Sequence, residues 1–198
     1  MMKLEDCKVA FAAVGLVGVL ILASPTLGLV LHLPGGEKFS ELWVLGSSHM
    51  IENYPLNVKA GEVCKVFLGV SNHMGSLSYY VIKVKFRNQT EPLPDSEAGI
   101  ASPLPALYEY HVVIPDGESW ETKLTFSVLN VSAFENRCAV GLLKINNSTF
   151  TVDKMTLWDV NRRGYYYQPF FELWIYDGNL GTFHFHNRFV NFWLNVTV

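Results

Sequence analysis

The chain has few cysteines, no excess of basic residues and no stretch that reads as a long amphipathic helix. Its 15 basic residues face 18 acidic ones, which gives a net charge of -3 spread over 198 residues. Without a basic stripe there is no electrostatic footprint for a phosphate backbone, so we expect no nucleic-acid partner. The aromatic fraction of 14%, with many Val and Thr residues, favours pleated strands, and the composition predicts an all-β domain.

Recognisable catalytic motifs are also missing. The sequence has no nucleophile elbow, no phosphate-cradling glycine loop and no zinc-protease helix, and its scattered carboxylates define no acid pair. We therefore expect neither an enzyme nor a cofactor. His184 and His186, two apart on a predicted strand, share one face as two metal ligands would, and Glu109 or His111 would have to supply a third. A metal-dependent enzyme or metal carrier is thus a minority hypothesis.

Charged residues are absent from Val9 to Gly36. The apolar run over residues 9–33 is long enough to cross the roughly 30 Å of membrane hydrocarbon. A cleaved signal peptide is the alternative interpretation. Apolar sequence resumes after Pro25, however, and the Ala23-Ser24-Pro25 stretch offers no clean cleavage site. We therefore interpret residues 9–33 as a retained signal anchor.

This interpretation divides the chain into four parts. Residues 1–8 form a cytoplasmic N-terminus, 9–33 the transmembrane helix, 34–38 a linker and 39–198 an extracytoplasmic domain. The lysines around the span favour an inside N-terminus only slightly. Stronger support comes from the N-glycosylation sequons, which exceed chance as a group and begin at Asn88, Asn130, Asn146, Asn147 and Asn195. We expect a single-pass, glycosylated protein of the cell membrane.

Cysteine usage fits an oxidising compartment. Cys64 and Cys138 form a lone pair in the predicted outer domain. A disulfide between them would stabilise the domain by about 4 kcal/mol if their Cβ atoms face each other. Two buried free thiols are the equal alternative.

After Leu45 the sequence becomes short alternating runs separated by turn residues, which predicts an antiparallel sandwich of immunoglobulin-like character with eight or nine strands. The run 64–71 and the run 80–87 are separated by a short turn, so we expect them to pair as a hairpin. Runs 108–114 and 120–128 predict a second hairpin. Between these pairs, the prolines of residues 88–105 predict a long surface loop.

Stretches near the beginning and the end of the predicted domain resemble a known family. Its opening block is matched by Phe39 to Gly46, Asn53 to Asn57 and Val70 to His73, and its closing strands by Phe171 to Tyr176 and Arg188 to Thr197. The chain after Gly36 thus resembles the extracytoplasmic module of the family catalogued as domain of unknown function 1616. The resemblance implies a predicted membrane protein of largely archaeal type without assigned activity. The single predicted helix departs from the several helices associated with that family.

Aromatic residues predict a partner surface on the outer face of the domain. Trp174 and Tyr176 are out of phase with their apolar neighbours, as Trp193 is with Leu194, and Tyr165, Tyr166 and Tyr167 precede them. Exposed rings mark protein or carbohydrate partners, although a second sheet or the proline-rich loop would equally explain them if it covers this face. We expect a binding or envelope-structural protein, or alternatively an accessory ectodomain of a larger membrane complex.

Overall fold

The computed structural model describes Lys8, residues 11–19 and residues 37–197. Contacts divide the chain into two units, residues 1–38 and Phe39–Val198, and each is considered by itself. Residues 11–19 are helical, while residues 9–10 and 20–33 of the predicted span lie outside the described part. Among the described residues, no helix combines the length and the apolar character needed to cross a membrane.

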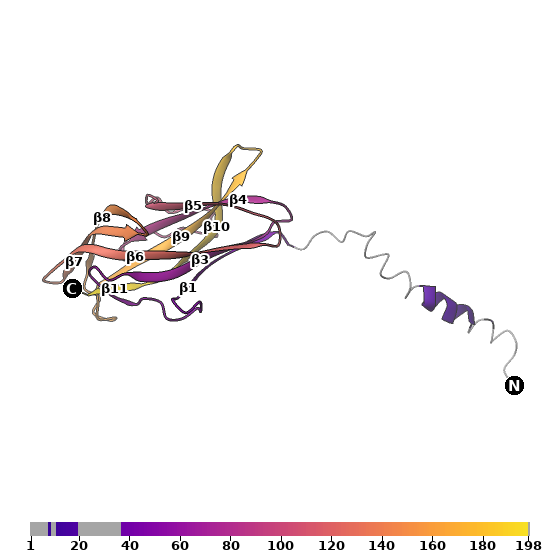
Figure 1. Ribbon diagram of the computed structural model, residues 1–198, viewed down its shortest axis with the longest axis horizontal. Helices are drawn as coiled ribbons and strands as arrows, with labels where there is room; N and C mark the ends of the chain where they lie inside the picture. Colours follow the sequence, from indigo (N-terminus) through magenta and orange to yellow (C-terminus); the bar gives the residue numbers. More distant parts are fainter. Residues whose placement is uncertain (1–7, 9–10, 20–36, 198) are drawn as a thin grey trace, which may run out of the picture. The chain divides into compact units, whose positions relative to one another are not determined.

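The second unit is an all-β sandwich of two sheets (Figure 1), in which every strand pair is antiparallel except β2 and β11, which pair in parallel. The five-stranded sheet has the order β1-β3-β6-β7-β8, and the six-stranded sheet has the order β2-β11-β9-β4-β5, with β10 also paired to β9. The strands are β1 Phe39–Leu45, β2 Asn57–Lys59, β3 Cys64–His73, β4 Ser78–Arg87, β5 Tyr108–Ile114, β6 Ser119–Phe134, β7 Arg137–Ile145, β8 Ser148–Leu157, β9 Tyr166–Asp177, β10 Thr182–Asn191 and β11 Leu194–Thr197.

Residues 37–197 contain eleven strands, which is more than the eight or nine predicted. Residues 39–45 lie before the alternating pattern becomes clear, and β2 is only three residues long. The predicted last strand is also divided. Phe192 and Trp193 separate β10 from β11, which lie along the same edge of β9.

Alternation along each strand explains the core. On β4, Tyr80, Ile82, Val84 and Phe86 are at most 2% exposed and belong to the cluster between the sheets, because side chains two apart share a face. Val66, Leu68 and Val70 of β3 are fully buried in the same cluster from the other sheet. These apolar faces were readable from the sequence.

The two predicted hairpins are wrong. β3 pairs with β1 and β6, whereas β4 pairs with β5 and β9, so the turn after His73 crosses from one sheet to the other. The turn containing Gly117 makes the same kind of crossing between β5 and β6. Asn72 secures this end of the sandwich: its side-chain amide donates to the carbonyls of Ser76 and Ile114, both at 2.8 Å. Alternation identifies each strand's buried face but not its partner.

A polar chain joins the sheets beside these crossings. The hydroxyl of Tyr80 donates to Oδ1 of Asn72 at 2.9 Å and lies 2.7 Å from Oγ of Ser40 on β1. Nε2 of His186 on β10 lies 3.0 Å from the same Ser40 oxygen. Because buried polar atoms need partners, this chain fixes the edge of one sheet against the edge of the other.

Candidate functional site

Side chains from four neighbouring strands meet on the outer face of the six-stranded sheet. Tyr79 of β4 lies opposite Val113 of β5, and Phe183 of β10 lies opposite Tyr176 of β9. The Tyr79 ring is 4.9 Å from that of Phe183 and 6.1 Å from that of Tyr176, measured between centroids. The imidazole of His111 completes the group, since its Nδ1 lies 3.1 Å from the Tyr79 hydroxyl. We call these five residues the aromatic patch.

The aromatic patch is open to solvent. Tyr79 is 36% exposed, Tyr176 is 42% exposed and Val113 is 57% exposed. Their inward neighbours on the same strands are buried, so the exposure follows from the strand alternation. Contiguous exposed rings on a rigid sheet are uncommon on a surface without a partner. This patch is therefore our candidate binding site.

Charged groups border the patch on one side. Nζ of Lys83 lies 3.6 Å from the ring centroid of Trp174, a cation-π contact, and 4.0 Å from a carboxylate oxygen of Glu109. Glu109 in turn lies 3.3 Å from Nε2 of His111. The indole N–H of Trp174 donates to Glu172 at 3.0 Å. The border thus places a cation and a carboxylate next to the imidazole and the edge-on rings of the aromatic patch.

The proline-rich loop covers the other half of the same face. Lys85 and Glu172 form an ion pair of 2.9 Å with side chains 4% and 0% exposed. The backbone of Ser102, in the proline-rich loop, bonds to both members of this ion pair. Its N–H donates to Glu172 at 2.9 Å, and its carbonyl accepts from Lys85 at 2.8 Å. Phe170, opposite Lys85 in the strand register, is also fully buried. The loop is therefore docked on the sheet.

A second polar contact holds the start of this loop. The guanidinium of Arg87 donates to Oε1 of Gln168 at 2.7 Å and also bonds to the carbonyl of Glu91. The same guanidinium lies 5.6 Å from the ring of Trp193. Burial lowers the pKa of Arg87, although the nearby Glu91 carboxylate opposes that effect. The Arg87 guanidinium thus joins Gln168 on β9 to Glu91 in the loop.

The structure divides the predicted aromatic surface among separate places. Trp174 and Tyr176 lie on the outer face, beside and within the aromatic patch. Tyr166 packs edge-on against Trp193, at 6.3 Å, in a different cluster. Tyr165 packs instead against Trp158, at 5.0 Å, beyond the end of β8.

Tyr167 does not belong to any partner surface, which corrects its predicted role. It is fully buried, and its hydroxyl donates to the carbonyls of Cys138 at 2.6 Å and Lys154 at 3.2 Å. Burial raises its pKa above the usual tyrosine value. The physical reason is that side chains alternate between the two faces of β9, which begins at Tyr166, so Tyr166 and Tyr167 point to opposite faces.

The predicted disulfide is not formed. Cys64 and Cys138 are free and buried. Cys64 lies opposite Phe126, which lies opposite Ile145, so Cys138 is seven positions further along β7. At about 3.3 Å per residue the two cysteines are displaced by about 20 Å along the strands, well beyond the reach of a disulfide. Burial, with a smaller effect of Glu62, raises the pKa of the Cys64 thiol to about 11.

The two histidines of the metal hypothesis do not acquire a third ligand. His184 is exposed, and His186 is half-buried against Ser40. Their neighbour Phe183 belongs to the aromatic patch with His111, and Glu109 borders that patch. Strand alternation therefore places His184 and His186 on the opposite face. No group of three or more His, Cys, Asp or Glu side chains suited to a metal occurs among residues 8, 11–19 and 37–197. Burial lowers the pKa of His186, and His184 and Arg188 act in the same direction.

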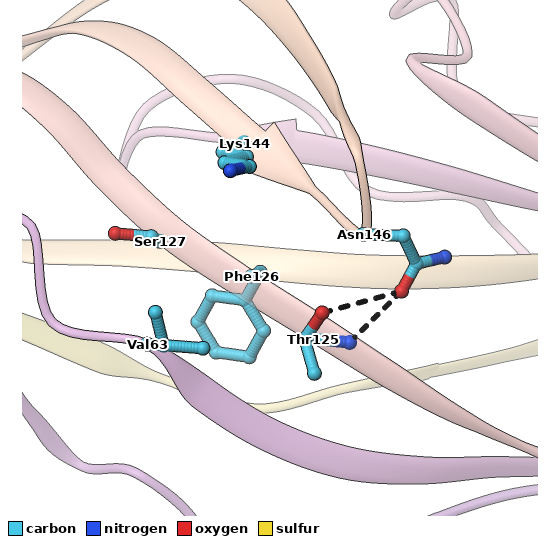
Figure 2. Close-up of a pocket in the computed structure, with 6 residues that line it drawn as sticks. All are labelled: Val63, Thr125, Phe126, Ser127, Lys144 and Asn146. Atoms are coloured by element: carbon cyan, nitrogen blue, oxygen red, sulfur yellow. Dashed lines mark hydrogen bonds between the residues drawn. The ribbon is translucent and has the colours of Figure 1, made fainter.

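The sequon asparagines differ in what their side chains already bind. Asn146 is committed to the fold (Figure 2): its Oδ1 accepts from the N–H and hydroxyl of Thr125 at 3.1 and 3.4 Å, and its amide donates to Tyr110 at 2.8 Å. The cavity beside it, of about 100 Å³, is lined by Val63, Phe126 and Lys144 among others. It is too small to count as a ligand site.

Two further sequon amides are engaged as well. The amide of Asn88 donates to the carbonyl of Met155 at 3.0 Å, and that of Asn195 donates to Asn57 at 2.9 Å. Asn130 is exposed but has a φ of 50° and packs over Gly141. Asn147, exposed at the turn between β7 and β8, makes no side-chain hydrogen bond within the described residues.

Sequence reasoning missed Tyr79, His111 and Phe183. His111 was assigned to the metal hypothesis, and Tyr79 and Phe183 were given no role, because strand pairing alone brings the three together. The available signal was the phase of Tyr79, which is opposite to that of Tyr80, Ile82 and the rest of the buried face.

A model of the family described as Domain of unknown function (DUF1616) matches residues 33–144. The closing strands that resemble the same family lie beyond that range. No curated protein matches the chain.

Among solved structures, a β-glucosidase from Listeria innocua in complex with gluconolactone is similar over 81% of this chain and 16% of its own, at 12% identity and a TM-score of 0.39. The CARDB domain of a Pyrococcus furiosus protein, in complex with di-metal ions, is similar over 84% of this chain and 94% of its own, at 10% identity and a TM-score of 0.40. At these scores neither similarity bears on function.

Proposed function

The chain belongs to the family of Domain of unknown function (DUF1616), whose name carries no activity, and from this premise we propose that it is a membrane-anchored surface protein whose sandwich binds a saccharide of the cell envelope. The aromatic patch is the observation that carries the proposal. The uncharged run over residues 9–33 is the proposed anchor, with the N-terminus inside. In this proposal the sandwich is immunoglobulin-like and lies outside the cell.

The chemistry of the aromatic patch suits a sugar. Saccharides offer C–H faces that stack on aromatic rings and hydroxyl edges that need hydrogen-bond partners. Tyr79, Tyr176 and Phe183 supply rings from adjacent strands, held against one another at 4.9 to 6.1 Å. His111 and Glu109 supply polar atoms at the border. A rigid sheet presents these groups without the entropic cost of ordering a loop.

The test uses the full-length protein in detergent, applied to an array of polysaccharides released from the envelope of the cell that produces it. We expect Tyr79→Ala and Phe183→Ala each to weaken binding at least tenfold. Tyr166→Ala is the matched control, because this tyrosine lies in a different cluster with Trp193. Equal binding by the patch variants, or no binding by the unmodified protein, would contradict the proposal.

Topology has its own test. If the domain lies outside a cell that glycosylates proteins, sugar should be found at Asn147 ahead of Asn146, whose amide is bonded to Tyr110. Site-resolved mass spectrometry with Asn147→Gln and Asn146→Gln variants measures this directly. A chain purified from its native membrane without sugar at any sequon would oppose the surface placement.

A further inference from the structure

A second candidate surface lies at the end of the sandwich that is remote from the start of β1. It consists of the β6–β7 turn, residues 134–137, and the loop from residue 157 to residue 165, which we together call the apical tip. Phe39 pairs with His73, near the start of β6, whereas Phe134 ends that strand of 16 residues. At about 3.3 Å per residue the apical tip stands about 50 Å from the first strand's beginning. Figure 1 shows β7, β8 and β11 gathered at this end.

The apical tip carries exposed apolar side chains. Phe134 is 76% exposed, Val160 is 77% exposed, Leu157 is 58% exposed and Trp158 is 42% exposed. Leu157 and Phe134 lie on either side of Arg137 in the strand register, so these side chains come from neighbouring positions. Such groups are normally buried in a soluble domain, and their concentration at one end marks an interaction site.

Hydrogen bonds hold the two loops of the apical tip together. The N–H of Trp158 donates to the carbonyl of Asn136 at 2.8 Å, and the hydroxyl of Tyr165 donates to the carbonyl of Glu135 at 3.2 Å. Within the longer loop, Oδ1 of Asp159 accepts from the N–H groups of residues 161 and 162, both at 3.0 Å. The exposed side chains are therefore presented in a fixed arrangement, which lowers the entropic cost of binding.

A cavity of about 290 Å³ lies beside one of these side chains, that of Trp158. Trp158 and Tyr165 pack edge-on at 5.0 Å on one side of it, and Arg163 and Asn195 also line it. Gly164 has no room for a side chain, since a Cβ there would lie 2.2 Å from Oδ1 of Asn195. The cavity is near the lower limit of ligand pockets and suits a single bulky side chain.

The charged side chain in the lining of the cavity is Arg163, and a second arginine of the apical tip, Arg137, lies outside that lining at the start of β7. Arg137 and Arg163 form no ion pair within the described part of the chain, whereas the carboxylate of Asp159 is occupied by backbone N–H groups and by Arg162 at 4.0 Å. Glu135 is the remaining acidic group of the apical tip. Trp, Tyr and Arg in one place are also the residues that dominate binding at protein interfaces.

We propose that the apical tip docks a protein partner through a segment that carries acidic residues beside one bulky apolar side chain. The apolar side chain enters the cavity next to Trp158. The acidic groups pair with Arg163 in the cavity lining and with Arg137 at the neighbouring β6–β7 turn. This site is independent of the aromatic patch and of saccharide binding. It gives the domain the features of an accessory ectodomain, which recruits another protein while anchored from its opposite end.

The test selects a phage-displayed library of random 12-residue peptides against the full-length protein held in nanodiscs of zwitterionic lipid. We expect enriched peptides with Asp or Glu adjacent to Phe, Trp or Leu. Trp158→Ala and Arg163→Glu should each weaken the selected peptides at least tenfold. Tyr79→Ala in the aromatic patch is the matched control and should bind like the unmodified protein.

Three results would overturn the proposal. Peptides without an acidic and apolar pattern would refute the stated chemistry, and selected peptides that still bind both apical variants would place the site elsewhere. The third result is that no peptide is enriched, while added vesicles of anionic phosphatidylglycerol bind the protein and lose binding when Trp158 or Arg163 is replaced. That result would show that the apical tip recognises a lipid surface. Circular dichroism of each variant verifies that lost binding is not lost folding.

Discussion

The outer face of the six-stranded sheet has a covered half and an open half. The covered half contains Lys85 and Glu172, sealed by the loop that carries Ser102. The open half contains Tyr79 and Tyr176 and faces solvent. The same strands, β4 and β9, supply both halves with the same alternation. Where the loop covers the sheet, the charged residues beneath it form buried contacts that stabilise the fold. Where no loop covers the sheet, the aromatic rings remain available for a partner.

The largest expected effect belongs to the covered half. Glu172→Ala should lower the free energy of unfolding by about 3–5 kcal/mol, because it leaves the ammonium of Lys85 buried without its carboxylate. Urea unfolding followed by circular dichroism measures the loss. The double variant Lys85→Met, Glu172→Leu is the control and should recover most of the stability, since it removes both buried charges. A loss below about 1 kcal/mol for Glu172→Ala would mean that the loop does not seal the pair in solution.

A matched pair of tyrosines sharpens the comparison. Tyr167→Phe should destabilise the domain by about 1–3 kcal/mol, because the buried carbonyls of Cys138 and Lys154 lose their donor. Tyr176→Phe, on the open half, should change the free energy of unfolding by less than about 0.5 kcal/mol. The same urea titration compares them. Equal losses would show that Tyr176 also has a structural hydrogen bond in solution.

The sequence predicted which side of each strand is buried, but not what lies over the other side. The phase of Tyr80, Ile82 and Val84 is visible in a single strand. The docking of residues 88–105 and the crossing after His73 depend on contacts between distant segments. The predicted hairpins failed for that reason, since a short turn can join two sheets as readily as two neighbours.

The candidate site was predicted only in part for the same reason. Trp174 and Tyr176 were assigned to the outer face from phase. Tyr79, His111 and Phe183 join them only through pairing among β4, β5, β9 and β10. The apical tip also depends on pairing, because Phe134 and Leu157 are brought together by the strand register on either side of Arg137.

The open half should contribute little stability. Tyr79→Ala removes packing against Phe183 and Tyr176 but leaves no cavity in the core, so we expect a loss of less than about 1 kcal/mol. Thermal and urea unfolding, run beside the saccharide array, separate stability from binding. If Tyr79→Ala lowers the free energy of unfolding as much as Glu172→Ala does, the aromatic patch stabilises the fold. The reason for assigning the patch to a ligand would then be gone.

The smallest expected effect concerns pH at the edge of the sandwich. Burial lowers the pKa of His186, so the unfolded chain takes up the proton first as pH falls from 7. The folded state should therefore lose stability as the pH drops from the usual histidine value of about 6.5 to the lower folded one. His186→Gln preserves a hydrogen-bonding side chain near Ser40 and should flatten this part of the profile, measured as urea midpoints between pH 7 and pH 5. An unchanged slope would assign the acid sensitivity to groups other than His186. The hydrogen bonds from Tyr80 to Ser40 and Asn72 would then join the two sheets whether His186 is protonated or neutral.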